Sequence, residues 1–363
     1  MVMMRNKWEI LNDLKPLIVM VIVQFTYAGL NFFYKLAAND GMNLRILVVY
    51  RFLFAAAFTA PLAFFFERKT RPRLTWTVLG QAFISGLLGG SLVQNLYLES
   101  LALTSATFAA AMANLIPALT FILAVCFRLE SLGLRKVDGK AKVLGTLTSV
   151  AGAMMMTFYK GLEIKLRWTN PHFMKEGHLN HRPRGGSCFL GALMSVGSSL
   201  SYASWLIIQA KMNETYPSPY STTALINVMA SIQAVVFTLC FERRWREWKL
   251  GWNIRLFTVA YSGVISSGVV VVLLAWCMQV RGPLYASVFN PLSLILVAAA
   301  GTLVLDEKLS LGSVLGAVLI VCGLYFVLWG MAEETKRMSK SNHLQAVEII
   351  ASAIDTDAKD DEK

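Results

Sequence analysis

Long uncharged stretches alternate along this chain with short segments that contain Lys, Arg, Gly or Pro. A helix needs about 20 consecutive apolar residues to cross the hydrocarbon core of a bilayer, and most of these stretches reach about that length. The pattern predicts ten membrane-spanning helices, at residues 16–34, 46–66, 74–98, 101–127, 143–159, 188–210, 220–241, 256–280, 284–305 and 310–332. We therefore expect an all-α integral membrane protein.

The composition agrees with this expectation. Hydrophobic residues make up 56% of the 363 residues and charged residues only 15%, whereas soluble proteins average about 25% charged residues. The net charge is +12, but Lys and Arg stand in short runs at the ends of apolar stretches, where lipid headgroups attract them. We therefore expect the lipid bilayer, and no nucleic acid, as a partner. The five cysteines stand singly, so the sequence predicts neither a disulfide framework nor a metal site.

Two of the predicted spans carry asparagine and proline at their centre. Asn114 and Pro117 lie in the span 101–127, and Asn290 and Pro291 lie in the span 284–305. A proline inside a helix leaves a carbonyl one turn back unpaired, and hydrocarbon offers that carbonyl no water. We therefore predict two interrupted helices, with Pro117 and Pro291 as gating residues. The asparagines either bind an amino or carboxylate group of a substrate or simply repair the broken helix.

Sequence repeats relate the two halves of the chain. Tyr27-Ala28 and Tyr202-Ala203 are separated by the same offset as Phe66-Glu67-Arg68-Lys69 and Phe241-Glu242-Arg243-Arg244, and a V-L-G-x4-V-x-G motif begins at both Val143 and Val314. Five helices per repeat would place the second copy upside down, which is typical of secondary transporters. The predicted organisation is an N-terminal segment (1–12), two inverted five-helix repeats (13–159 and 188–332), a basic central loop (160–187) between them, and a disordered tail (333–363).

Basic residues in the short loops predict the orientation of the chain. The loops after the second and fourth spans are rich in Lys and Arg, which favours the cytoplasmic side and places both termini there. The second half disagrees, because the basic loop after the seventh span then lies outside. In this orientation the only N-x-[ST] acceptor, Asn213-Glu214-Thr215, falls in a cytoplasmic loop, so we expect it to be unglycosylated.

Several longer motifs resemble a known family. They are ERKTRPRLT (67–75), TSATFAAAMANLIPALTFILA (104–124), AKVLGT (141–146), VAGAMMMTFYKG (150–161), FNPLSLILVA (289–298) and LGSVLGAVLIVCGLYFVLWG (311–330). These motifs resemble the plant walls-are-thin-related family, also called EamA-like, nodulin-like or UMAMIT transporters, of the drug/metabolite transporter superfamily. The resemblance implies a ten-helix carrier of amino acids, or in some members of auxin. It also implies the plasma membrane or the vacuolar membrane, and we expect the plasma membrane.

Polar side chains at helical spacing predict a substrate cavity. Polar groups inside a bilayer are costly and tend to face the interior of a bundle. Gln24, Tyr27 and Asn31 share one face of the first span, and the sixth span offers a corresponding face. The residues of that second face are Ser199, Tyr202, Trp205 and Gln209. The alternative role of these side chains is hydrogen bonding between neighbouring helices.

Arg51 is a charged residue within the second predicted span, because it lies about one and a half turns inside the apolar stretch. Its guanidinium suits the carboxylate of a substrate. The alternative is that the side chain extends to the lipid headgroups.

Three classes of function compete. The chain lacks H-E-x-x-H, and the segment 133–140 lacks the spacing of a phosphate loop, so we expect no enzyme and no cofactor. A receptor or scaffold does not explain the duplication. We therefore predict a secondary transporter, an exporter or bidirectional facilitator of amino acids, that works by alternating access at a midplane cavity. The alternative cargo is auxin or another small organic acid, and the carrier could also be a homo-oligomer.

Overall fold

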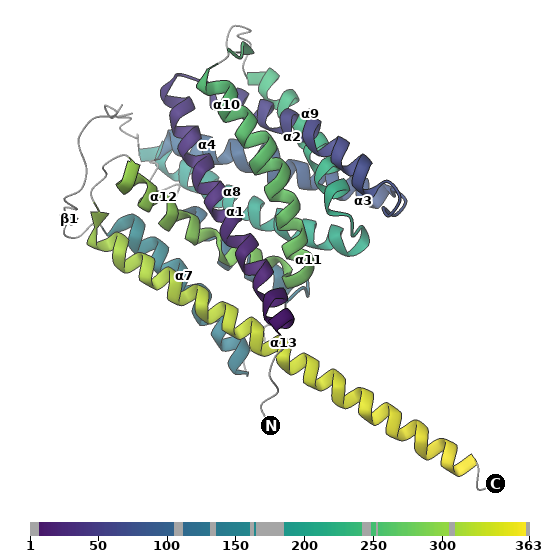
Figure 1. Cartoon of the computed structure of the whole chain (residues 1–363). Helices are drawn as coiled ribbons and strands as arrows, with labels where there is room; N and C mark the ends of the chain where they lie inside the picture. The colour runs from purple at the N-terminus through teal and green to yellow at the C-terminus, as the bar shows by residue number, and fades with distance from the viewer. Residues whose placement is uncertain are drawn as a thin grey trace.

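The computed structural model describes residues 7–104, 112–130, 136–159, 163–164, 185–241, 248–251, 253–304 and 309–360. The first half contains α1 (Lys7–Asn39), α2 (Leu44–Glu67), α3 (Trp76–Ser85), the π-helical η1 (Gly86–Leu92), α4 (Val93–Leu103), α6 (Ile116–Cys126) and α7 (Val137–Phe158). The second half contains α8 (Gly185–Thr215), α9 (Pro219–Phe241), α10 (Ile254–Ala260), the π-helical η3 (Tyr261–Val269), α11 (Val270–Val288), α12 (Asn290–Val304) and α13 (Leu311–Asp360). Two short strands, β1 (Glu163–Ile164) and β2 (Leu309–Ser310), pair antiparallel. The described chain is therefore almost entirely helical, as predicted (Figure 1).

Eight helices among the described residues are long and apolar enough to cross a membrane. Two further apolar helices, Ile116–Cys126 and Asn290–Ala299, are shorter than a bilayer core requires. These two lie where the sequence predicted interrupted spans. The structure therefore supports a multi-pass membrane protein with eight candidate spans, and the count of ten stays a prediction.

The two predicted interruptions take a different form from a kink in the middle of a helix. Pro117 lies in the first turn of α6, after a turn at Asn114 and Leu115. Pro291 is the second residue of α12, after a turn at Phe289. Proline suits the first turn of a helix, because its missing N–H would have no partner there. Both prolines therefore begin a helix, which corrects the expectation that they lie inside one.

The π-helical segments occupy corresponding places in the two halves. η1 begins at Gly86 and η3 begins at Tyr261, and the same offset separates Tyr27 from Tyr202. A Cβ added at Gly86 would lie 2.9 Å from the backbone nitrogen of Ala230 on α9, and one at Gly263 would lie 2.7 Å from the carbonyl oxygen of Arg51 on α2. Each π-helical segment therefore packs against the second helix of the opposite half, and such segments often mark functional sites.

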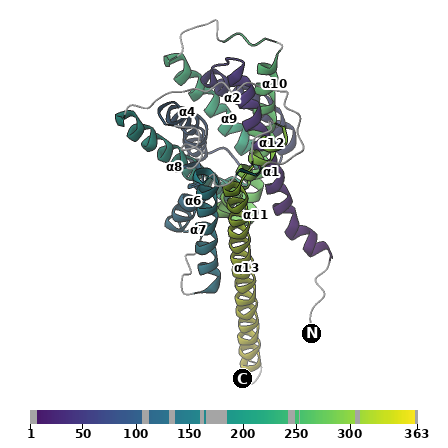
Figure 2. The ribbon, with the colours of Figure 1, turned by 90° about the vertical axis from the view of Figure 1, so that its left-hand side faces the viewer.

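Helices α7 and α13 lie side by side along one edge of the bundle (Figures 1 and 2). Glycines bring the two backbones together: a Cβ at Gly145 would lie 2.7 Å from the carbonyl oxygen of Gly323, and a Cβ at Gly152 would lie 2.8 Å from that of Gly316. The shared V-L-G-x4-V-x-G motif is therefore the seam between these helices, where small residues allow close approach.

A buried group of charges closes one end of this helix pair. The Lys142 ammonium on α7 binds Glu130 at 2.7 Å and also binds Glu334 on α13. Arg337 binds Asp138 at 2.6 Å. Burial raises the pKa of the Glu130 carboxyl above its ordinary value, and the charge of Lys142 opposes that shift. These ion pairs fix the middle of α13, at Glu334 and Arg337, against the start of α7.

The C-terminal segment differs from its prediction. We expected residues 333–363 to be disordered, but α13 continues as one helix to Asp360 (Figure 1). This segment contains neither glycine nor proline and many good helix formers, so no residue stops the helix that begins in the apolar span. The start of α1 and the end of α13 lie on the same side of the bundle in both views (Figures 1 and 2).

The glycosylation acceptor also lies in a different place. Asn213 lies inside α8 rather than in a loop, its side chain is 4% exposed, and its Nδ2 donates to the carbonyl oxygen of Ala275 at 3.1 Å. We therefore expect no glycan on Asn213 in either membrane orientation, so endoglycosidase treatment of the wild type will not shift its electrophoretic mobility. A shift that the change Asn213→Gln removes would contradict this burial.

An engineered acceptor can test the orientation instead. Lys175→Asn with Gly177→Thr places an N-E-T sequence in the central loop. If both termini are cytoplasmic, that loop is outside and the reporter is glycosylated. An unmodified reporter in a correctly inserted protein would contradict cytoplasmic termini.

Candidate functional site

Two tyrosines from corresponding positions of the two halves meet inside the bundle. The side chains of Tyr27 on α1 and Tyr202 on α8 interact with each other. The ring of Trp205, one turn further along α8, lies 5.1 Å from that of Tyr202. Helix α1 packs on α10, α11 and α12, whereas α8 packs chiefly on α3, α4, α6 and α11. The tyrosine pair therefore bridges the interior between the two sets of helices, as the predicted polar faces require.

Arg51 lies in the same interior and does not extend to the headgroups. Its side chain is 8% exposed, its Nε donates to Ser267 Oγ at 2.5 Å, and its Nη1 donates to Tyr34 Oη at 2.9 Å. Its charge acts on both Tyr27 and Tyr202. No carboxylate of the described residues pairs with this guanidinium. A buried cation without a counterion is unfavourable, so an anionic group would be stabilised beside it.

Asn227 on α9 holds the partner of Arg51 in place. Its Nδ2 donates to the carbonyl oxygen of Ser267 at 3.1 Å and lies 3.4 Å from Thr59 Oγ1 on α2. Ser267 belongs to η3, where π-helical geometry leaves carbonyl groups available for such bonds. The position of Arg51 is therefore set by groups from both halves of the chain.

Buried amides next to these groups lack partners. Gln24 is 1% exposed and Gln209 is 0% exposed, and neither the nitrogen nor the oxygen of either amide makes a hydrogen bond in the described structure. The indole nitrogen of Trp205 is also without a partner. Such groups are rare in native proteins and each costs about 1–3 kcal/mol. All three residues belong to the predicted faces, and a bound polar molecule would satisfy them.

Asn31 is the exposed member of the polar face of α1. It lies two helical turns after Gln24 on the same face of α1, yet its side chain is exposed. The opposite face of α1 carries the exposed apolar residues Ile18, Ile22 and Phe25 and is the lipid-facing side. Asn31 is therefore accessible on the side of α1 that carries Gln24, away from the exposed apolar face.

Other predicted residues have structural roles or lie apart. Ser199 Oγ lies 2.9 Å from the carbonyl oxygen of Met112, next to the interruption at Asn114, so its hydroxyl satisfies backbone that the break exposes. Asn114 and both prolines are buried near the helix breaks. Asn290 is half-buried, its carbonyl accepts a bond from Ser293 at 2.7 Å, and in the described structure it is not hydrogen-bonded to the Arg51 group.

Sequence reasoning missed Tyr34, Ser267 and Asn227. Tyr34 continues the polar face of Gln24, Tyr27 and Asn31, so extending the same helical spacing by three residues would have found it. Ser267 and Asn227 carried no comparable signal, because serine and asparagine in apolar spans usually serve helix packing.

The comparisons with known proteins agree with this architecture. The sequence model of the EamA-like transporter family matches twice, at residues 14–158 and 189–329. The WAT1-related protein At1g25270 of Arabidopsis thaliana is 42% identical over 92% of this chain and 94% of its own length. The WAT1-related protein At1g68170 of the same plant is 44% identical over 91% and 94%. One crystal structure superposes with a TM-score of 0.64 at 17% identity, covering 85% of this chain and 98% of that chain.

The chain therefore belongs to the EamA-like transporter family. Its relatives place it among the WAT1-related proteins of plants, as the motifs predicted.

Proposed function

We propose that this protein is a secondary transporter that moves amino acids across the membrane, with auxin or another small organic acid as the alternative cargo. The observation that carries the proposal is the buried guanidinium of Arg51, which has no acidic partner among the described residues. Amino acids and auxin-like acids share a carboxylate, and a guanidinium binds a carboxylate through paired hydrogen bonds.

The groups around Arg51 suit the rest of such a molecule. The free amides of Gln24 and Gln209 can accept bonds from an ammonium group, and the tyrosine oxygens can do the same. Asn114 and Asn290 lie at the interrupted helices, away from Arg51, and are proposed as further contacts of the cargo. The rings of Tyr202 and Trp205 provide an apolar wall for a side chain. An amino acid would use Arg51, the groups that accept from its ammonium and the rings, whereas an acid without an ammonium group would use only Arg51 and the rings.

The sequence repeat that relates the two halves of the chain supports alternating access. In this proposal the repeats 13–159 and 188–332 are inverted, the site lies at the midplane between them, and the breaks at Pro117 and Pro291 allow the halves to rock. Both termini are cytoplasmic, and the plasma membrane is the proposed location.

Efflux measurements test the proposal. Oocytes expressing the protein are loaded with radiolabelled amino acids, and efflux is expected to exceed that of uninjected oocytes. Labelled indole-3-acetic acid serves as the second cargo. Efflux of that acid alone would select the alternative cargo, and no increase for any cargo despite surface expression would indicate a receptor or scaffold.

Thiol labelling tests the alternating-access mechanism. Asn31→Cys in a cysteine-free background is expected to react with an impermeant thiol reagent and to be protected by a transported amino acid. Pro117→Ala and Pro291→Ala are expected to change this reactivity in opposite directions, because each restores a backbone N–H and straightens the interrupted helix of one half. Changes in the same direction, or no change in folded protein, would reduce both prolines to a structural role.

A further inference from the structure

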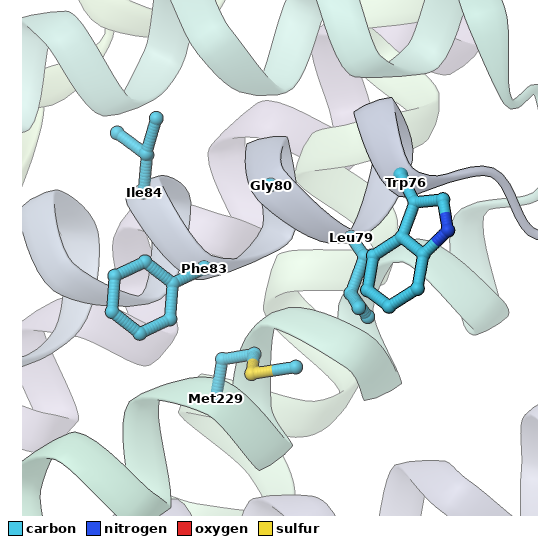
Figure 3. Close-up of a pocket in the computed structure, with 6 residues that line it drawn as sticks. All are labelled: Trp76, Leu79, Gly80, Phe83, Ile84 and Met229. Atoms are coloured by element: carbon cyan, nitrogen blue, oxygen red, sulfur yellow. The ribbon is translucent and has the colours of Figure 1, made fainter.

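An apolar groove lies on the outer surface of α3 and α9, away from the Arg51 site. It has a volume of about 360 Å³ and is lined by Trp76, Leu79, Gly80, Phe83 and Ile84 of α3 and by Met229 of α9. Figure 3 shows Trp76 and Leu79 on one side of the groove, Phe83 on the other and Met229 below. Trp76 is 88% exposed. The groove is thus an open apolar depression on a membrane-spanning helix.

A strongly basic segment leads directly into this groove. Arg68, Lys69, Arg71 and Arg73 are all exposed, and they precede Trp76 by a few residues. The nearest carboxylate in sequence, Glu67, is buried and accepts bonds from the backbone N–H groups of Tyr220 and Ser221 at the start of α9. In the described structure no acidic side chain pairs with Arg71 or Arg73. The positive charge of this segment therefore remains available to a partner.

The geometry matches the two ends of a phospholipid. Trp76 begins α3, and tryptophan favours the level of the headgroups. From Trp76 to Ile84 an α-helix rises about 12 Å, so the groove runs from that level into the hydrocarbon. Gly80 leaves space in its middle, because an added Cβ there would meet no atom within 4 Å. Positive charge thus lies at the headgroup end of the groove, and the apolar part of the groove extends from there into the hydrocarbon.

We propose that this surface binds one anionic phospholipid. The headgroup lies against Arg71 and Arg73, with Lys69 beside them, and one acyl chain lies in the groove over Gly80. Each basic residue near the membrane surface strengthens the attraction to an anionic headgroup by about fivefold. Charge complementarity therefore selects an anionic lipid over a zwitterionic one.

The bound lipid would touch the helices that support the transport site. Met229 lies two residues after Asn227, which holds Ser267, and α3 leads into η1, where Gly89 packs against Trp205. Lipid dependence of transport would follow from these contacts. That consequence rests on the proposed function, whereas binding itself does not.

Native mass spectrometry of the purified full-length protein tests binding without any transport assay. The detergent-solubilised protein is titrated with dioleoylphosphatidylserine or dioleoylphosphatidylcholine, and the bound fraction is measured. Phosphatidylserine is expected to bind about tenfold more tightly or better. The soluble headgroup glycerophosphoserine, which lacks acyl chains, is expected not to displace it.

Two variants test separately how the headgroup and the acyl chain contribute to binding. Arg71→Gln with Arg73→Gln is expected to remove the preference for phosphatidylserine. Its control, Lys136→Gln with Lys140→Gln, removes two exposed charges elsewhere and is expected to keep that preference. Gly80→Leu places a side chain in the groove, at a position where an added Cβ meets no atom within 4 Å, and is expected to weaken binding of both lipids by about tenfold. Its control is Ala151→Leu on an exposed position of α7, which is expected to leave binding unchanged.

Three outcomes would overturn the proposal: equal affinity of the wild type for both lipids, equal effects of the variants and their controls, or displacement by glycerophosphoserine. A lipid-independent dimer that Gly80→Leu dissociates would assign the groove to a second copy instead. Thermal unfolding of each variant verifies that it is folded. If phosphatidylserine binds as expected but no cargo moves, the proposed function fails while the lipid site stands.

Discussion

Arg51→Gln is expected to lower transport by about 30-fold or more while the protein still reaches the membrane. Removing one partner of a buried, hydrogen-bonded charge pair typically costs about 2–5 kcal/mol, and the carboxylate of the cargo would be the second partner. The empty protein should tolerate the change, because Arg51 has no counterion among the described residues and its loss leaves no charge unpaired.

The comparison with lysine makes this prediction specific. Arg51→Lys is expected to retain part of the flux, because it keeps the charge but loses the paired hydrogen bonds. Arg255→Gln is the matched control, since Arg255 forms an ion pair with Asp40 that is partly exposed to solvent. Initial rates of labelled efflux at several cargo concentrations, normalised to surface protein, provide the measurement. Normal flux in both Arg51 variants would show that this guanidinium binds no cargo.

Gly323→Leu is expected to separate α7 from α13 and destabilise the whole protein. A Cβ at Gly323 would lie 2.5 Å from the backbone nitrogen of Ser149 and 2.6 Å from the carbonyl oxygen of Gly145. Backbone atoms cannot rotate away as a side chain can, so the helices must move apart. Overpacking of this kind costs about 1–3 kcal/mol for a few methylenes, and the shift of α13 would also strain the ion pairs of Lys142.

Thermal unfolding monitored by size-exclusion chromatography of detergent-solubilised protein measures this effect. We expect the midpoint to fall by about 5 °C or more. Gly80→Ala is the matched control, because its Cβ would meet no atom within 4 Å. An unchanged midpoint for Gly323→Leu would mean that the two helices are not packed as closely as described here.

Length and hydrophobicity predicted most of the helical elements, because only continuous apolar helices satisfy their backbone within a bilayer. Single residues predicted the ends and breaks of helices less reliably. Pro117 and Pro291 begin helices rather than bend them, and Asn213 lies within α8 although the predicted span ended at residue 210. The helical segment after residue 332 escaped prediction because its polar composition is also typical of disorder.

The sequence by itself determined the membrane class, the family and the paired polar faces of the first and sixth spans, since each depends on residues close together in the chain or on a repeated pattern. It also predicted that Gln24, Tyr27, Trp205 and Gln209 face the interior of the bundle, because a helical period defines a face without knowledge of its neighbours. Only the tertiary structure decided that Arg51 points inward. Its partners, Tyr34 and Ser267, come from α1 and η3, and Asn227 joins them from α9. The direction of a long side chain depends on which groups fold against it, and those groups lie up to 216 residues away in the chain.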